Sequence, residues 1–118
     1  MSRIGTLEEL RAALAAFAAE RDWEQFHSPK NLSMALAAEA GELLEHFQWL
    51  SEAQSQDLSE ATRDEVALEI ADVLLFLVRL ADRLGIDPIE AAARKLELNA
   101  RKYPVEKSRG RATKYDRL

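Results

Sequence analysis

The sequence predicts an all-α protein, folded as an antiparallel four-helix bundle. Apolar residues recur every three or four positions through most of the 118 residues. Helix start signals precede these stretches, and no segment alternates apolar and polar residues as a strand does. Four helices with short connections favour an antiparallel bundle. We expect one domain unit, with helices over residues 1–104 and a basic tail over residues 105–118 that belongs to the same unit.

The helix limits follow from local signals. Thr6 and Ser28 are typical N-cap residues, each placed just before an apolar repeat. Gly85 is a typical residue after a helix C-terminus, and Pro104 disfavours helix at the residue before it. The expected helices cover residues 6–23, 28–50, 59–84 and 87–103, with a polar loop over residues 51–59.

Composition excludes several classes of function. The chain has no cysteine, which excludes disulfides, zinc ribbons and thiol nucleophiles, and its four glycines cannot form a phosphate-binding loop. The tail has five basic and two acidic residues, so residues 1–104 carry a net charge of −8. An acidic body argues against nucleic acid as a partner. No signal peptide or membrane-spanning run is visible, so we expect a cytoplasmic protein without a membrane partner.

Four acidic residues lie in unusually apolar surroundings. Residues 66–78 are apolar except for Glu69 and Asp72, which are three apart and share a helix face. Glu39 and Glu42 repeat this spacing in the second helix. Burying paired carboxylates is unfavourable unless a positive charge compensates them. For either pair alone, a partly exposed acidic stripe or an ion pair with an arginine is the more ordinary interpretation. Both pairs together predict a site for Mg²⁺, or for Mn²⁺, because these cations prefer oxygen ligands.

Aromatic and basic residues near these acids suggest a nucleotide. Trp23 and His27 precede the second helix, and Trp49 lies seven residues after Glu42. Tryptophan can stack on a nucleobase, although core packing is the more ordinary role for either one alone. His27 alone is more typical of a structural histidine. Lys95 and Asn99 share a face of the fourth helix and could meet phosphates, or form a solvated face.

The sequence text around these residues resembles a known family. The spacing Glu39-x-x-Glu42 followed by Glu69-x-x-Asp72 looks like the metal-binding signature of the MazG-like all-α nucleotide pyrophosphohydrolases. The stretches over residues 21–32, 39–49 and 99–104, with the closing Lys114-Tyr115, resemble its dCTP pyrophosphatase branch. The resemblance extends over residues 6–115.

The resemblance implies an enzyme that cleaves a nucleoside triphosphate between its α and β phosphates with Mg²⁺. It implies a homo-oligomer, with a tetramer favoured over a dimer. Glu39, Glu42, Glu69 and Asp72 would bind the metal, and Glu42 is our first choice for the carboxylate that accepts the proton of the attacking water. The implied substrate-binding residues are Trp23, His27, Trp49, Phe76, Lys95, Asn99, Lys114 and Tyr115.

Two residues depart from the resemblance. Phe76 stands where we expect a tyrosine in mammalian members, and Leu14 stands where we expect a histidine. Both changes remove polar contacts and therefore affect base and sugar selectivity. The favoured function is hydrolysis of dCTP or 5-modified dCTP. The alternatives are a broader or dUTP-preferring enzyme of the same superfamily, and a non-catalytic helical interaction module.

Overall fold

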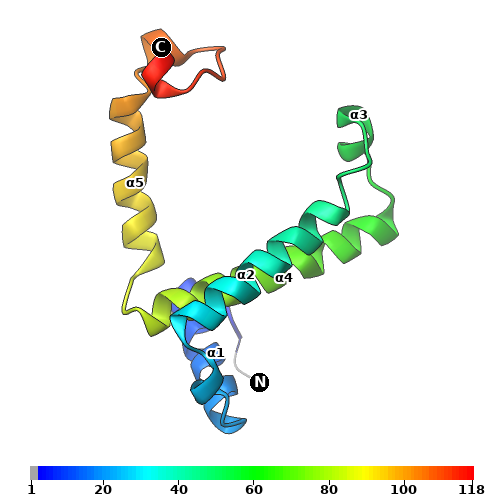
Figure 1. Ribbon diagram of the computed structural model, residues 1–118, viewed down its shortest axis with the longest axis vertical. Helices are drawn as coiled ribbons and strands as arrows, with labels where there is room; N and C mark the ends of the chain where they lie inside the picture. The colour runs from blue at the N-terminus through cyan, green and yellow to red at the C-terminus, as the bar shows by residue number, and fades with distance from the viewer. Residues whose placement is uncertain (1–2) are drawn as a thin grey trace. The chain divides into compact units, whose positions relative to one another are not determined.

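The computed structural model describes residues 3–118, and every regular element within them is helical. This confirms the all-α fold class. Four long helices are present, as predicted. They are α1 (Leu7–Glu20), α2 (Pro29–Glu45), α4 (Glu60–Arg83) and α5 (Pro88–Lys102) (Figure 1). The short elements are η1 (Glu24–Phe26), α3 (Glu52–Ser55), α6 (Val105–Ser108) and η2 (Tyr115–Arg117).

Side-chain caps begin the long helices where the sequence predicts them. The hydroxyls of Thr6, Ser28 and Ser59 each accept a hydrogen bond from a backbone N–H in the first turn, at 3.1 to 3.2 Å. The Asp87 carboxylate does the same for α5. Each such cap stabilises its helix by about 1 kcal/mol. In a capping box the Glu9 carboxylate would also accept a hydrogen bond from the backbone N–H of Thr6. Here that carboxylate accepts from the Thr6 hydroxyl instead, so only half of the capping box forms.

The predicted limits are wrong at three places. α1 ends at Glu20 instead of Trp23, because Asp22 adopts a left-handed backbone with φ of 53°. Aspartate tolerates that conformation, but a right-handed helix cannot continue through it. α2 ends at Glu45, and residues 46–50 form turns instead of further helix. The expected loop over residues 51–59 contains α3, which Ser51 and Gln54 close with a capping box.

The chain divides into two compact units, one ending at Gly85 and one beginning at Ile86. In the first unit α2 and α4 lie antiparallel and side by side, and α1 packs against α4 (Figure 1). In the second unit the tail folds against the end of α5. The rings of Tyr103 and Tyr115 meet edge to face at 6.0 Å, and Lys102 Nζ lies 4.7 Å from the Tyr115 ring centre. The tail and α5 therefore form one unit.

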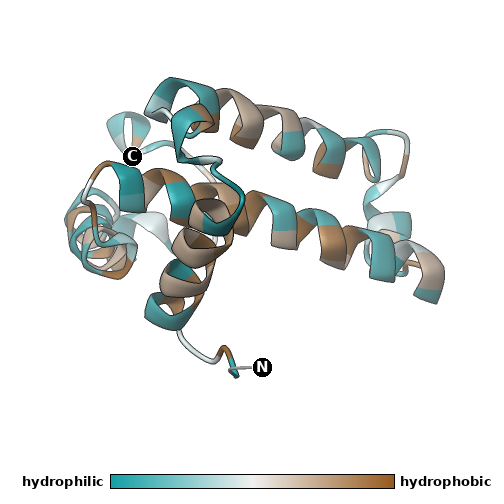
Figure 2. Ribbon diagram, turned by 90° about the horizontal axis from the view of Figure 1, so that it is seen from below, coloured by the Kyte–Doolittle hydropathy of each residue, from teal (hydrophilic) through white to brown (hydrophobic). Residues whose placement is uncertain are grey.

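The core is small for a chain of this size. Among residues 3–118, the buried apolar side chains are Ala18, Leu32, Val66, Val78 and Ala81. Apolar segments nevertheless recur along all the long helices (Figure 2). Leu44 on α2 and Leu68 on α4 are 59% and 70% exposed. Much apolar surface therefore stays in contact with solvent. No described helix combines the length and apolarity that are needed to cross a membrane.

Candidate active site

Three of the four predicted metal ligands converge between α2 and α4. Glu39 extends from α2, and Glu69 and Asp72 extend from α4. Each offers a carboxylate oxygen, and these oxygens lie within 4.8 Å of one another. The spacing of three residues puts Glu69 and Asp72 on one face of α4, and the side-by-side packing of the two helices brings that face to Glu39. All three side chains are half-buried.

This acidic cluster has unsatisfied oxygens. Glu39 Oε2 and Glu69 Oε2 are buried, and neither has a hydrogen-bond partner. No ion pair among residues 3–118 involves these acids, so the ordinary interpretation as arginine ion pairs is not what the fold adopts. Buried carboxylate oxygens without partners are unfavourable. Three converging oxygen donors fit a hard divalent cation, which would satisfy them.

The protonation of Glu39 reflects the same crowding. The neighbouring Glu42 side chain, partial burial and the carboxylate of Glu69 together raise the pKa of Glu39 to about 7. Glu42 itself is exposed and does not offer an oxygen to the convergent set. The fold thus places Glu42 beside the cluster, one turn along α2 from Glu39.

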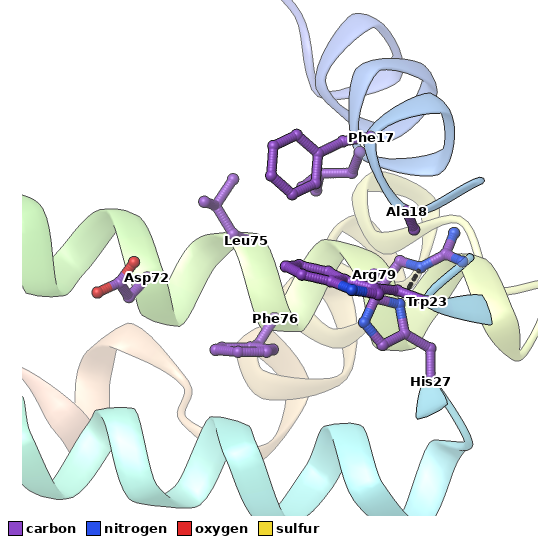
Figure 3. Close-up of a pocket in the computed structure, with 9 residues that line it drawn as sticks. Phe17, Ala18, Trp23, His27, Asp72, Leu75, Phe76 and Arg79 are labelled. Atoms are coloured by element: carbon purple, nitrogen blue, oxygen red, sulfur yellow. Dashed lines mark hydrogen bonds between the residues drawn. The ribbon is translucent and has the colours of Figure 1, made fainter. Parts of the chain in front are cut away.

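An apolar cavity adjoins the cluster. Its volume is about 160 Å³. An engineered cavity of about 150 Å³ is large enough for benzene, so this one is of a size for a single six-membered ring. Figure 3 shows aromatic rings from α1, α4 and the connection between α1 and α2 around it. The lining residues are Leu14, Phe17, Ala18, Trp23, His27, Asp72, Leu75, Phe76 and Arg79.

Asp72 is shared by the cavity and the acidic cluster. It lies two helical turns before Arg79 on α4, which is about 10 Å along the helix axis. His27 and Arg79 lie together at the end of the cavity away from Asp72 (Figure 3). A ligand ring in the cavity would therefore have an acidic, metal-binding end on one side and a basic end on the other.

Buried polar contacts organise the basic end. Arg79 is 5% exposed, and its Nε donates to His27 Nδ1 at 3.0 Å. Its Nη1 donates to Asp82 at 3.3 Å, and Nη2 is buried without a partner. From the sequence, an arginine is expected only as an ion-pair partner of the acids, and Arg79 is not assigned to the site. Arg79 lies seven residues after Asp72 and therefore on the same side of α4. This spacing is the sequence signal that could have identified Arg79 as a site residue.

The predicted substrate-binding residues fall into three groups. Trp23, His27 and Phe76 line the cavity. Trp49 does not line it and is 87% exposed, so core packing within the chain is wrong for this residue. The remaining four, Lys95, Asn99, Lys114 and Tyr115, lie in the second unit, where Asn99 is half-buried and the others are exposed.

The two departures from the resemblance both belong to the cavity wall. Leu14 on α1 and Phe76 on α4 are lining residues, with Phe17 and Leu75 beside them. The sequence did not single out Phe17, Ala18 or Leu75, because apolar residues at helical spacing are indistinguishable from core positions. An apolar side chain at both departures leaves the middle of the cavity without a polar group.

Comparisons with known proteins identify the family of this chain. The model of the MazG-like family matches residues 34–118. The dCTP pyrophosphatase 1 of Rattus norvegicus is 49% identical over 115 residues, which cover 96% of this chain and 68% of the rat protein. The Homo sapiens protein of the same name is 45% identical over the same shares.

A solved structure shares the fold. The crystal structure of a pyrophosphatase from Archaeoglobus fulgidus is similar with a TM-score of 0.80 and 44% identity, over 88% of this chain and 97% of that one. The family match extends over most of the chain and includes both acids of α2 and both acids of α4. The chain therefore belongs to the MazG-like family.

Proposed function

We propose that this protein is a Mg²⁺-dependent pyrophosphohydrolase that converts dCTP, or 5-modified dCTP, to the monophosphate and pyrophosphate. The enzyme class, a nucleoside triphosphate pyrophosphatase, follows from the relatives named dCTP pyrophosphatase 1 and from the pyrophosphatase of the same fold. The observation that carries the proposal is the junction at Asp72, where a cluster with unsatisfied carboxylate oxygens meets a cavity the size of one pyrimidine ring.

Each end of the site has a chemical role in this proposal. Glu39, Glu69 and Asp72 would hold the metal, with Glu42 beside them. Mg²⁺, when bound, would neutralise triphosphate charge and favour in-line attack of water on the α-phosphorus. Glu42 is exposed next to the cluster, so it is free to accept the proton of that water.

The cavity would hold the base. Trp23 and Phe76 offer aromatic faces for stacking, and the ring-sized volume disfavours a purine. We keep Lys95, Asn99, Lys114 and Tyr115 as proposed contacts to phosphates and sugar. They lie in the second unit, and we propose that α5 and the tail act with the first unit as one functional domain. The chemistry requires only a small-molecule nucleotide as partner.

A substrate panel tests the proposal. Pyrophosphate release is measured for dCTP, 5-methyl-dCTP, dUTP, dTTP, dATP and dGTP, with Mg²⁺ and with chelator. We expect turnover of the cytosine nucleotides only with Mg²⁺, and loss of turnover in Glu42→Gln and Asp72→Asn. Equal or faster turnover of dUTP would favour the broader enzyme. Activity without a divalent cation, or full activity in both variants, would contradict the proposed metal site.

A non-catalytic interaction module is the alternative of a different class. It would show no turnover of any nucleotide in the panel. The unsatisfied oxygens of Glu39 and Glu69 disfavour it, because a module that binds only proteins has no use for partnerless buried carboxylates.

A further inference from the structure

His27 and Arg79 form a contact that the reaction itself does not require. They come from segments 52 residues apart, the connection before α2 and the second half of α4. Arg79 Nε donates to His27 Nδ1 at 3.0 Å, and the arginine side chain is only 6% exposed. A charged group is rarely buried this completely without a specific reason.

The chemistry of the two groups fixes the position of one proton. A guanidinium has donors only and stays charged, so the imidazole nitrogen that faces it must accept. A neutral imidazole that accepts at Nδ1 carries its proton on Nε2. Burial, and then the charges of Arg79 and Arg83, lower the pKa of His27, and the charge of Glu24 opposes them. The ring therefore stays neutral near pH 7.

Neighbouring groups hold the arginine in place. Asp82 accepts from Arg79 Nη1 through one oxygen and from Arg11 Nη1 through the other, both at 3.3 Å. This links α1 to α4. Arg83 also contacts His27, but its Nε donates to the backbone oxygen at 3.2 Å and does not touch the ring. Arg79 and Arg83 are thus a matched pair of cations, of which only Arg79 donates a hydrogen bond to the imidazole.

We propose that Arg79 is a positioning residue for base recognition. It holds His27 as the neutral Nε2–H tautomer, so that the cavity presents an N–H donor to a carbonyl oxygen of a pyrimidine base. The second ring nitrogen of His27 faces the side of the cavity where Phe76 lies (Figure 3). Because Leu14 and Phe76 are apolar, this donor is one of the few polar groups of the cavity that can contact a pyrimidine carbonyl. The proposal rests on the proposed function in one respect, that the cavity takes the base.

The tautomer can be measured without any substrate. The chain has two histidines, so ¹⁵N NMR of the side chains gives two resolvable ring systems, with His46 as the internal reference. At pH 7.5 we expect the Nε2–H form of His27 in the wild type, a mixture of tautomers in Arg79→Ala, and no change in Arg83→Ala. An Nδ1–H or protonated His27 in the wild type would overturn the proposal, as would an unchanged tautomer in Arg79→Ala.

Kinetics test the consequence for recognition. A lost hydrogen bond at a binding site weakens binding by about 5- to 10-fold. Arg79→Ala should therefore raise KM for dCTP by about that factor and leave kcat within about twofold, while Arg83→Ala leaves both unchanged. Arg79→Lys keeps a cation that can only donate, so it should restore the tautomer and part of the binding that Arg79→Ala loses. Wild-type KM in Arg79→Ala would contradict the assigned role.

The two measurements separate two kinds of failure. If the wild type hydrolyses no nucleotide, the proposed function fails, while the NMR result still decides whether Arg79 sets the tautomer. If Arg79→Ala does not fold, Arg79→Met replaces it, because methionine preserves the aliphatic part of the buried side chain without donors. A wild-type KM in folded Arg79→Met would overturn the role in base recognition.

Discussion

Glu39 is a proposed metal ligand, and its position is unfavourable for a charged carboxylate when no metal is bound. Its carboxylate lies within reach of Glu69 and Asp72, and one of its oxygens is buried without a partner. The same neighbours that would share a cation with it repel its charge when no cation is present. Function and stability are therefore opposed at this residue, as is common at sites that bind metals.

The raised pKa of Glu39 predicts a pH dependence in chelator. Its pKa is about 7 in the folded chain and about 4.5 when unperturbed, so between these values the folded state binds more protons than the unfolded state. The contribution of Glu39 to stability is therefore fully present below about pH 4.5 and is lost as the pH rises through about 7. Thermal unfolding at pH 5 to 8 in chelator should show this fall in the wild type and a smaller one in Glu39→Gln.

A control and a metal titration sharpen this test. Glu45→Gln is the control. It changes an exposed glutamate at the C-terminal end of α2, and the variant should show the same pH dependence of stability as the wild type. Mg²⁺ should raise the melting temperature more at pH 8 than at pH 6, because protons compete for Glu39. Identical pH slopes in wild type and Glu39→Gln would contradict the assigned repulsion.

At the scale of elements, the pairing of α2 with α4 creates the site. Each helix supplies acids at a spacing of three, and neither helix could form the cluster alone. Gly41 lies between the two acids of α2, where a close approach by another group would explain a glycine. A Cβ at Gly41 would meet no atom of residues 3–118 within 4 Å, apart from its own stretch of helix. Within the chain, the glycine therefore has only its helix-weakening effect.

This absence of contacts predicts the effect of alanine. Gly41→Ala should raise the free energy of unfolding by about 0.5–1 kcal/mol, because alanine loses less backbone entropy in a helix. Chemical denaturation measures the change. Ala40→Gly, at the adjacent exposed position, is the matched control and should lower the free energy by a similar amount. Destabilisation by Gly41→Ala would mean that a second chain or a ligand approaches the backbone there.

At the scale of the whole molecule, large apolar side chains are exposed on helices of both units. Buried apolar side chains are few among the described residues, whereas Leu44, Leu68 and Trp49 are largely exposed. We therefore expect a homo-oligomer. Light scattering at micromolar concentration should give a multiple of the chain mass, and Leu68→Glu should shift the mass downward. A monomer mass for the wild type would contradict this prediction.

Trp49 provides a second prediction at this scale. It is 87% exposed in the turns that follow α2, and it does not line the cavity of its own chain. If it stacks on the base, as the resemblance implies, a second copy must supply it. Stacking contributes roughly 1–3 kcal/mol, so Trp49→Ala should raise KM for dCTP by about 5- to 150-fold with a smaller effect on kcat.

Stability and oligomeric state complete the Trp49 test. An exposed tryptophan contributes little to the core of its own chain, so the melting temperature should stay near the wild-type value unless the oligomer dissociates. Light scattering on the same variant distinguishes these cases. An unchanged KM in an intact oligomer would remove Trp49 from base binding.

Local patterns in the sequence were sufficient to predict the four long helices and to single out the four acids as a candidate cation site. The caps at Thr6, Ser28 and Ser59 and the apolar spacing are local properties, so four helices could be predicted from them. Two pairs of acids in apolar helices indicated a cation because the unfavourable burial of charge can be recognised from neighbouring residues alone. Local signals failed where backbone conformation decided the outcome, as at Asp22, whose left-handed φ ends α1 early.

Only the tertiary structure decided which residues meet. The sequence gives no distance between Glu39 and Glu69, thirty residues apart, and the packing of α2 on α4 supplies it. The pairing of His27 with Arg79 and the contribution of Phe17 and Leu75 to a ring-sized cavity depend on α1 packing against α4. The physical reason is that helix propensity acts over a few residues, whereas cavities and buried hydrogen bonds depend on contacts between segments distant in sequence.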